Sequence, residues 1–94
     1  MKLIEIKEVE DCIDSSNAKD FYFDENINEK LIRSLKRFGE VQYFPEFPIP
    51  YFRLNSPQYI ISGTTNKNHF RVMFSSTSFP QSYNNLKDFL AGFN

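Results

Sequence analysis

Five residues between positions 51 and 71 have side chains of the types that bind anions. Arg53 and Arg71 carry guanidinium groups, which form charge-assisted hydrogen bonds with phosphate and carboxylate groups. Ser62 and His69 add further hydrogen-bonding groups, and Tyr51 adds a hydroxyl group on an aromatic ring. These five are the candidate binding residues, because one strand pattern brings them all to one surface.

The candidate residues lie in a stretch that predicts a three-stranded antiparallel meander, in which apolar and polar residues alternate around two turns. A turn centred on residues 66–67 pairs Ser62 with Arg71 and Gly63 with Phe70. The second pair is apolar, and the glycine leaves room for the phenylalanine ring. The turn therefore predicts a register as well as two strands.

The earlier turn, at Asn55–Gln58, connects the first two strands of the meander. The same reasoning pairs Tyr51 with Ser62 and Phe52 with Ile61. All five candidate residues then lie on one face. Seven apolar side chains share the other face, which we predict to be the sheet's half of the core: Phe52, Leu54, Tyr59, Ile61, Phe70, Val72 and Phe74.

A strand near the amino terminus offers a competing explanation for the arginines. Lys2–Val9 alternates imperfectly, and we expect Ile4 and Ile6 to face the core. Glu5 and Lys7 would then lie on the same face as the arginines. Cross-strand ion pairs with Glu5 would account for the arginines without any ligand, so the sequence leaves both explanations open.

An amphipathic helix is predicted after residue 26. Asn26 is a candidate N-cap, Glu29 follows three residues later as in a capping box, and Gly39 is placed as a C′ glycine. The helix has an apolar stripe that we expect to be buried and four bases that we expect to be solvated. The stripe is Ile27, Leu31, Leu35 and Phe38, and the bases are Lys30, Arg33, Lys36 and Arg37.

Residues 41–50 combine aromatic residues with prolines, and we call them the proline-aromatic edge. Pro45, Pro48 and Pro50 lack backbone N–H groups, which a central strand requires. The segment is therefore predicted to be a sheet edge or a polyproline-like connection, with Phe44, Phe47 and Ile49 packing on the body. A final helix is predicted from Ser82, its candidate cap, with Tyr83, Leu86, Phe89, Leu90 and Phe93 at helical spacing.

These elements predict a single α+β domain over residues 1–94. The expected architecture is a two-layer sandwich, with an antiparallel sheet of three to five strands and two helices on one face. The order is β-α-β-β-β-α, and a ferredoxin-like variant is one possibility. Residues 10–25 are predicted to be irregular, although Phe21, Tyr22 and Phe23 are also compatible with a short strand.

The composition limits the chemistry that the chain can perform. Cys12 is the only cysteine and His69 the only histidine, so neither a disulfide nor a cysteine/histidine zinc site is predicted. The three glycines form no phosphate-binding loop. We therefore predict no cofactor, no metal and no catalysis. Without a secretory signal pattern or about 20 consecutive apolar residues, we expect a cytoplasmic protein without membrane contact.

Charge is distributed unevenly along the chain. Residues 1–29 hold nine acids and three bases, a net −6, and residues 30–94 hold eight bases and three acids, a net +5. We favour the interpretation that the acidic and basic halves neutralise each other in the folded state. The other interpretation is an acidic tail attached to a basic domain that binds a partner.

Two functional hypotheses follow from these features. The first is a small non-catalytic binding or accessory protein that contacts a protein partner or a second copy through the exposed sheet face, the proline-aromatic edge, or both. It rests on eleven Phe and five Tyr in 94 residues, because surplus aromatic residues often lie at interfaces. The alternative is a binder of anionic small molecules or single-stranded nucleic acid that uses the five candidate residues.

Overall fold

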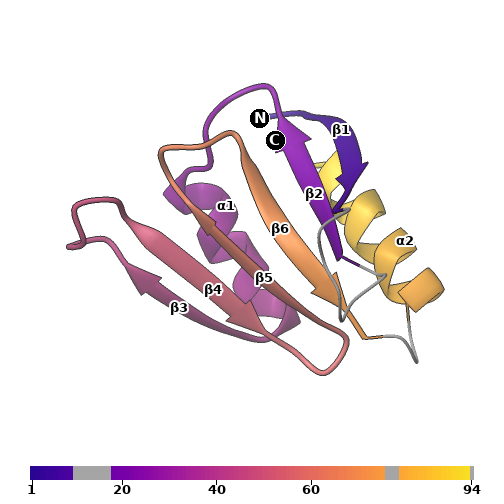
Figure 1. Cartoon of the computed structure of the whole chain (residues 1–94). Helices are drawn as coiled ribbons and strands as arrows, with labels where there is room; N and C mark the ends of the chain where they lie inside the picture. The colour runs from indigo at the N-terminus through magenta and orange to yellow at the C-terminus, as the bar shows by residue number, and fades with distance from the viewer. Residues whose placement is uncertain (10–17, 76–78, 94) are drawn as a thin grey trace.

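The computed structural model describes residues 1–9, 18–75 and 79–93. In this part of the chain, one antiparallel sheet of six strands lies against two helices, so the predicted α+β class is confirmed (Figure 1). The strands are β1 (Leu3–Glu8), β2 (Ala18–Phe23), β3 (Glu40–Phe44), β4 (Tyr51–Asn55), β5 (Tyr59–Thr64) and β6 (His69–Phe74). The helices are α1 (Glu29–Ser34), which continues as the 3₁₀ helix η1 (Leu35–Phe38), and α2 (Phe79–Ala91).

The number and order of the strands differ from the prediction. The order is β-β-α-β-β-β-β-α instead of β-α-β-β-β-α, and the strands are arranged β1-β2-β6-β5-β4-β3 across the sheet. This arrangement excludes the ferredoxin-like variant, which has a second helix between its strands. The two additional strands are β2 and β3. The six residues of β2 lie inside the segment predicted to be irregular, and their alternation is too short to be recognised. Strand β3 overlaps the segment that was predicted to be a sheet edge or a polyproline-like connection.

The chain path explains how distant segments become neighbours. The hairpin of β1 and β2 lies beside the last strand, β6. After β2 the chain crosses behind the sheet through α1 and η1, reaches the far edge at β3, and returns strand by strand to β6 (Figure 1). Residues of β2 therefore lie next to residues that are about fifty positions later in the sequence.

The register of β5 and β6 is confirmed, whereas that of β4 and β5 was wrong by two residues. Ser62 lies opposite Arg71 as predicted. Phe52, however, lies opposite Gly63 and not opposite Ile61. The reason is that the turn is centred one residue later than predicted, between Pro57 and Gln58, where the Ser56 N–H donates to the Tyr59 carbonyl oxygen at 3.1 Å. A shift of two residues leaves every side chain on its predicted face.

The seven sheet residues predicted for the core are all buried. Burial raises the pKa of Tyr59 among them to about 12. Other buried core residues come from β2, from the helices and from the segment before α1: Phe21, Phe23, Ile27, Leu31, Ile32, Leu35, Leu86 and Leu90. The helices thus cover one face of the sheet only.

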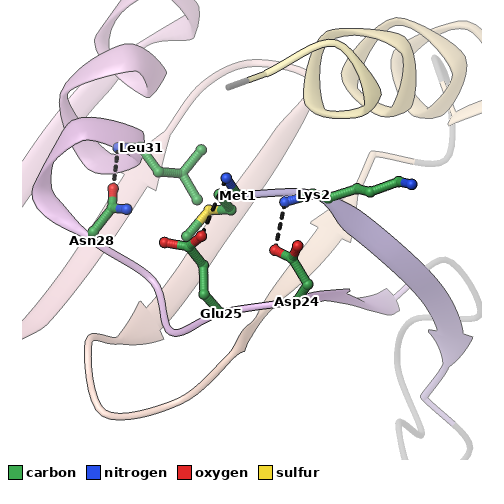
Figure 2. A network of polar contacts seen from close by, with 6 residues as sticks. All are labelled: Met1, Lys2, Asp24, Glu25, Asn28 and Leu31. Atoms are coloured by element: carbon green, nitrogen blue, oxygen red, sulfur yellow. Dashed lines mark hydrogen bonds and ion pairs between the residues drawn. The ribbon is translucent and has the colours of Figure 1, made fainter.

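The start of α1 lies two residues later than predicted. Asn28, not Asn26, is the N-cap, and its side-chain oxygen accepts a hydrogen bond from the Leu31 N–H at 2.9 Å. Figure 2 shows this cap beside two contacts that hold the first residues of the chain against the β2–α1 connection. The Lys2 N–H donates to Asp24 Oδ1 at 2.7 Å, and the amino group of residue 1 lies 3.3 Å from a carboxylate oxygen of Glu25.

The predicted role of Gly39 was wrong. Its φ of 170° is extended backbone and not the left-handed conformation of a C′ glycine. Glycine is required there for a different reason. A Cβ atom at position 39 would overlap the Asn55 carbonyl oxygen and lie 3.0 Å from Ser56 Cβ.

Two further expectations are corrected at the ends of the chain. Ile6 packs against the core as expected, but Ile4 faces solvent because the pairing of β1 with β2 shifts between Leu3 and Glu5, and Leu3 packs against the core in its place. Helix α2 begins at Phe79, and Ser82 is a buried residue within the helix rather than its cap. Cys12 and the first half of the segment predicted to be irregular, residues 10–17, lie outside the described residues.

Candidate functional site

The face of the sheet opposite the helices is the candidate site, and we call it the open face. A row of polar side chains crosses all six strands on this face, because each member lies directly opposite the next. From β1 to β3 the row consists of Lys7, Asp20, Arg71, Ser62, Arg53 and Gln42. The predicted grouping of Arg53, Ser62 and Arg71 is therefore present, with Ser62 between the arginines.

Arg71 is neutralised by a carboxylate that the sequence reasoning did not identify. Its Nε donates to Asp20 Oδ1 at 2.9 Å and its Nη2 donates to Asp20 Oδ2 at 3.2 Å. This is the bidentate geometry of strong arginine–carboxylate pairs. Glu5, the expected partner, lies 3.9 Å from Lys7 on its own strand instead. The alternation of Asp20 and Tyr22 with buried phenylalanines was the only sequence signal for this pair.

Arg53 has different surroundings. It lies between Ser62 on β5 and Gln42 on β3, and both neighbours are uncharged. No ion pair joins Arg53 to a carboxylate within residues 1–9, 18–75 and 79–93. Its side chain is exposed.

A second row on the open face is rich in aromatic rings. The rings of Tyr22 and His69 stack with centroids 4.6 Å apart, and those of Phe44 and Tyr51 stack at 6.3 Å. Tyr51 lies opposite Thr64 and not opposite Ser62 as predicted. Two of the five candidate residues, Tyr51 and His69, thus belong to this aromatic row rather than to the polar row.

A shallow depression on the open face gathers three of the candidate residues. Its volume is about 240 Å³, and Ser62, His69 and Arg71 line it together with Asp20 and Lys67. Arg53 and Tyr51 lie outside it. Clefts that bind small molecules usually enclose about 300–1,000 Å³, so this depression is small for such a ligand.

The proline-aromatic edge exposes more apolar surface than the sequence suggested. Phe47 and Ile49 were expected to pack on the body, but they are 48% and 50% exposed. Phe47 stacks on Phe44 at 5.1 Å, and Phe44 in turn stacks on Tyr51. A continuous aromatic cluster therefore runs from β4 to the connection after β3.

A groove lies on the other side of β3, between this strand and the α1–η1 segment, and we call it the β3 groove. It has a volume of about 420 Å³ and is lined by Glu29, Ile32, Arg33, Lys36, Val41 and Tyr43. The Tyr43 hydroxyl donates to Glu29 Oε2 at 3.0 Å. Desolvation, helped by this hydrogen bond to a carboxylate, raises the pKa of Tyr43 above its ordinary value.

The described residues contain no group of three histidine, cysteine, aspartate or glutamate side chains that could hold a metal ion. None of the helices in the described ranges is long and apolar enough to cross a membrane. No protein-family model, curated protein or solved structure matches this chain. The function is therefore inferred from the geometry of the sheet and its edges.

The Asp20–Arg71 pair gives a direct test of which carboxylate neutralises the arginine. Replacing Asp20 with asparagine removes a bidentate pair whose carboxylate is only 14% exposed, so we expect unfolding free energy to fall by about 1 kcal/mol. Glu5→Gln is the matched control, because its contact with Lys7 is long and exposed, and we expect a loss of only a few tenths of a kcal/mol. Urea unfolding measures both, and a larger loss for Glu5→Gln would show that the assignment is wrong.

Proposed function

We propose that this protein is a small non-catalytic binding or accessory protein that contacts a protein partner or a second copy of itself. The contact surface consists of the open face and the proline-aromatic edge. The observation that carries this proposal is the exposed aromatic cluster where these two surfaces meet. Phe47 and Ile49 are about half exposed, and the stacked rings of Phe44 and Tyr51 extend the cluster onto the sheet.

The exposed aromatic cluster leaves contiguous apolar surface in contact with water, which is unfavourable. Exposed apolar side chains that stand singly are normal on protein surfaces, whereas contiguous ones often mark interaction sites. The cluster is held in place because stacked rings and three prolines limit its conformations. A preorganised aromatic surface loses little conformational entropy on binding, which favours its use as an anchor for a protein partner.

The experiment compares the wild-type protein with Phe47→Ser combined with Ile49→Ser. Sedimentation velocity over a range of concentrations reports self-association, and affinity capture from a cell extract reports other partners. We expect an association that the double variant loses. Gln58→Ser is the control, because Gln58 is exposed in the turn between β4 and β5, away from the cluster. A strictly monomeric protein without a captured partner, or capture that the double variant retains, would contradict the proposal.

The alternative function is binding of anionic small molecules or single-stranded nucleic acid on the open face. Arg53, without a carboxylate partner in the described part of the chain, favours it, as do the aromatic rings in the neighbouring row. Against it, the strands carry as many carboxylates as cations on the open face, and among the described residues only Lys67, from the turn between β5 and β6, adds a further cation there. The cations are Lys7, Arg53 and Arg71, and the carboxylates are Glu5, Asp20 and Glu40.

This near-neutral face lacks the positive field that draws nucleic acid to a surface. We therefore rank protein binding first. Titration with a labelled oligothymidine at low and high salt separates the two functions, because binding driven by phosphate contacts weakens steeply with salt. Salt-sensitive binding that Arg53→Ala abolishes would favour the alternative, and absence of binding at low salt would eliminate it.

A further inference from the structure

The two edges of the sheet differ in how they are protected against pairing with another strand. Edge strand β1 has an irregular register between Leu3 and Glu5, and charged residues occupy three of its six positions. Both features discourage the addition of a further strand. Edge strand β3 pairs with β4 over five consecutive residues without a shift, and Glu40 at its start is its only charged residue.

Strand β3 therefore presents a regular edge. The described residues place no strand beyond it, so alternate backbone N–H and C=O groups of β3 point away from β4 without a strand partner. The three prolines of the proline-aromatic edge follow the strand and do not interrupt it. An extended peptide could thus continue the sheet at this edge.

The β3 groove lies directly beneath this edge and would receive every second side chain of such a peptide. Its volume of about 420 Å³ is within the range of ligand-binding clefts, about 300–1,000 Å³. Ile32 and Val41 give it apolar walls. The chain reverses direction at Gly39, between η1 and β3, so Lys36 lies near the end of the groove that Val41 lines. The hydrogen bond between Tyr43 and Glu29 lies toward the opposite end of the groove.

The charges in the groove select the kind of peptide. Of the four bases in α1 and η1, Lys30 lies over the ring of Phe93, and Arg37 lies over the rings of Phe38 and Phe89. The other two, Arg33 and Lys36, line the groove.

Glu29 is the only acid in the groove, and its carboxylate is already shared. Its Oε1 lies 3.7 Å from Arg33 Nη1, and its Oε2 accepts the Tyr43 hydroxyl. Within residues 1–9, 18–75 and 79–93, Lys36 has no ion pair. The groove thus keeps a net positive charge at its Val41 end.

We infer that the β3 groove binds an extended peptide of a partner protein, that an acidic side chain of this peptide lies beside Lys36, and that the peptide backbone adds a strand to β3. This inference rests on the proposed protein-binding function and names the type of partner. A second copy of the chain fits this edge less well. Antiparallel pairing of two β3 strands would bring two sets of Arg33 and Lys36 together, and like charges oppose such pairing.

The test uses a phage-displayed library of random seven-residue peptides selected on the wild-type protein. We expect enriched peptides that combine a glutamate or aspartate with β-branched or aromatic residues. Fluorescence anisotropy then measures the affinity of an enriched peptide for two variants. Lys36→Glu should weaken binding about tenfold or more, because it replaces attraction with repulsion. Lys30→Glu, on the same helix segment but outside the groove, should change affinity less than about twofold.

Amide hydrogen exchange provides the second readout. Strand addition should slow the exchange of outward-pointing amides in Glu40–Phe44 when the peptide is bound. Failure to enrich acidic peptides, unchanged affinity in Lys36→Glu, or protection confined to other strands would overturn the inference. A different outcome would separate the two proposals. If the Phe47→Ser, Ile49→Ser variant no longer binds the enriched peptides but Lys36→Glu still binds them, the proposed function is supported and the β3 groove is not the binding site.

Discussion

Replacing Gly39 with alanine is expected to lower the unfolding free energy by at least about 3 kcal/mol, the upper part of the range for overpacking substitutions. The added methyl group would overlap the carbonyl oxygen of Asn55, a backbone atom that cannot rotate away. Asn55 lies opposite Glu40, so a shift at this point would disturb the first pair of β3 with β4. The effect therefore reaches both the sheet edge and the β3 groove.

Gly92→Ala is the matched control for this substitution. The nearest atom to a Cβ at position 92 is the Asp88 carbonyl oxygen at 3.7 Å, an ordinary van der Waals contact. The Gly92 N–H also donates to that oxygen at 3.2 Å, as in a continuing helix. Alanine there should be neutral or stabilising by less than about 1 kcal/mol. Urea unfolding compares the two variants, and equal stabilities would show that position 39 accommodates a side chain.

Local alternation was sufficient to predict much of the meander. The buried side chains of β4, β5 and β6 occupy every second position, so a register error of two residues between β4 and β5 changed no face. The position of β2 could not be obtained in this way. Its place between β1 and β6 depends on a crossover of the chain behind the whole sheet, which no local pattern encodes.

The same limit explains why the sequence did not identify Asp20 as the partner of Arg71. Asp20 and Arg71 are 51 residues apart and become neighbours only through the β2–β6 pairing. Glu5 was the only carboxylate considered, because the amino-terminal strand was the one further strand expected beside the arginines. The five candidate residues all lie on the predicted face. Which arginine has an acidic partner, however, depends on Asp20, and this carboxylate reaches Arg71 only because β2 pairs with β6.

The uneven charge distribution is only partly explained by ion pairs between the two halves of the chain. Asp20–Arg71 and Glu29–Arg33 connect residues 1–29 with residues 30–94. The other ion pairs of the described residues join groups within residues 1–29. Among the residues that the structure describes, most bases of the second half therefore have no acidic partner from the first half, which is consistent with Lys36 being available to a partner peptide.

The second large effect is expected for Phe70→Ala, which should lower the unfolding free energy by about 4 kcal/mol. Phe70 is 1% exposed, and its ring contacts the rings of Phe21, Phe23 and Phe52 at centroid distances of 5.4–6.2 Å. These contacts join β6 to β2 on one side and, across β5, to β4. The residue opposite Phe70 is Gly63.

A cavity at position 70 would be costly because Gly63 has no side chain that could move into it. The remaining rings are held by their own strands, so the space would collapse only partly, and such cavities carry the largest penalties. Phe47→Ala is the control, since its ring is half exposed, and should cost less than about 1 kcal/mol. If Phe70→Ala is too unstable to measure, Phe70→Leu provides a smaller loss. A loss below about 1.5 kcal/mol for Phe70→Ala would mean that the three strands are not joined through this ring.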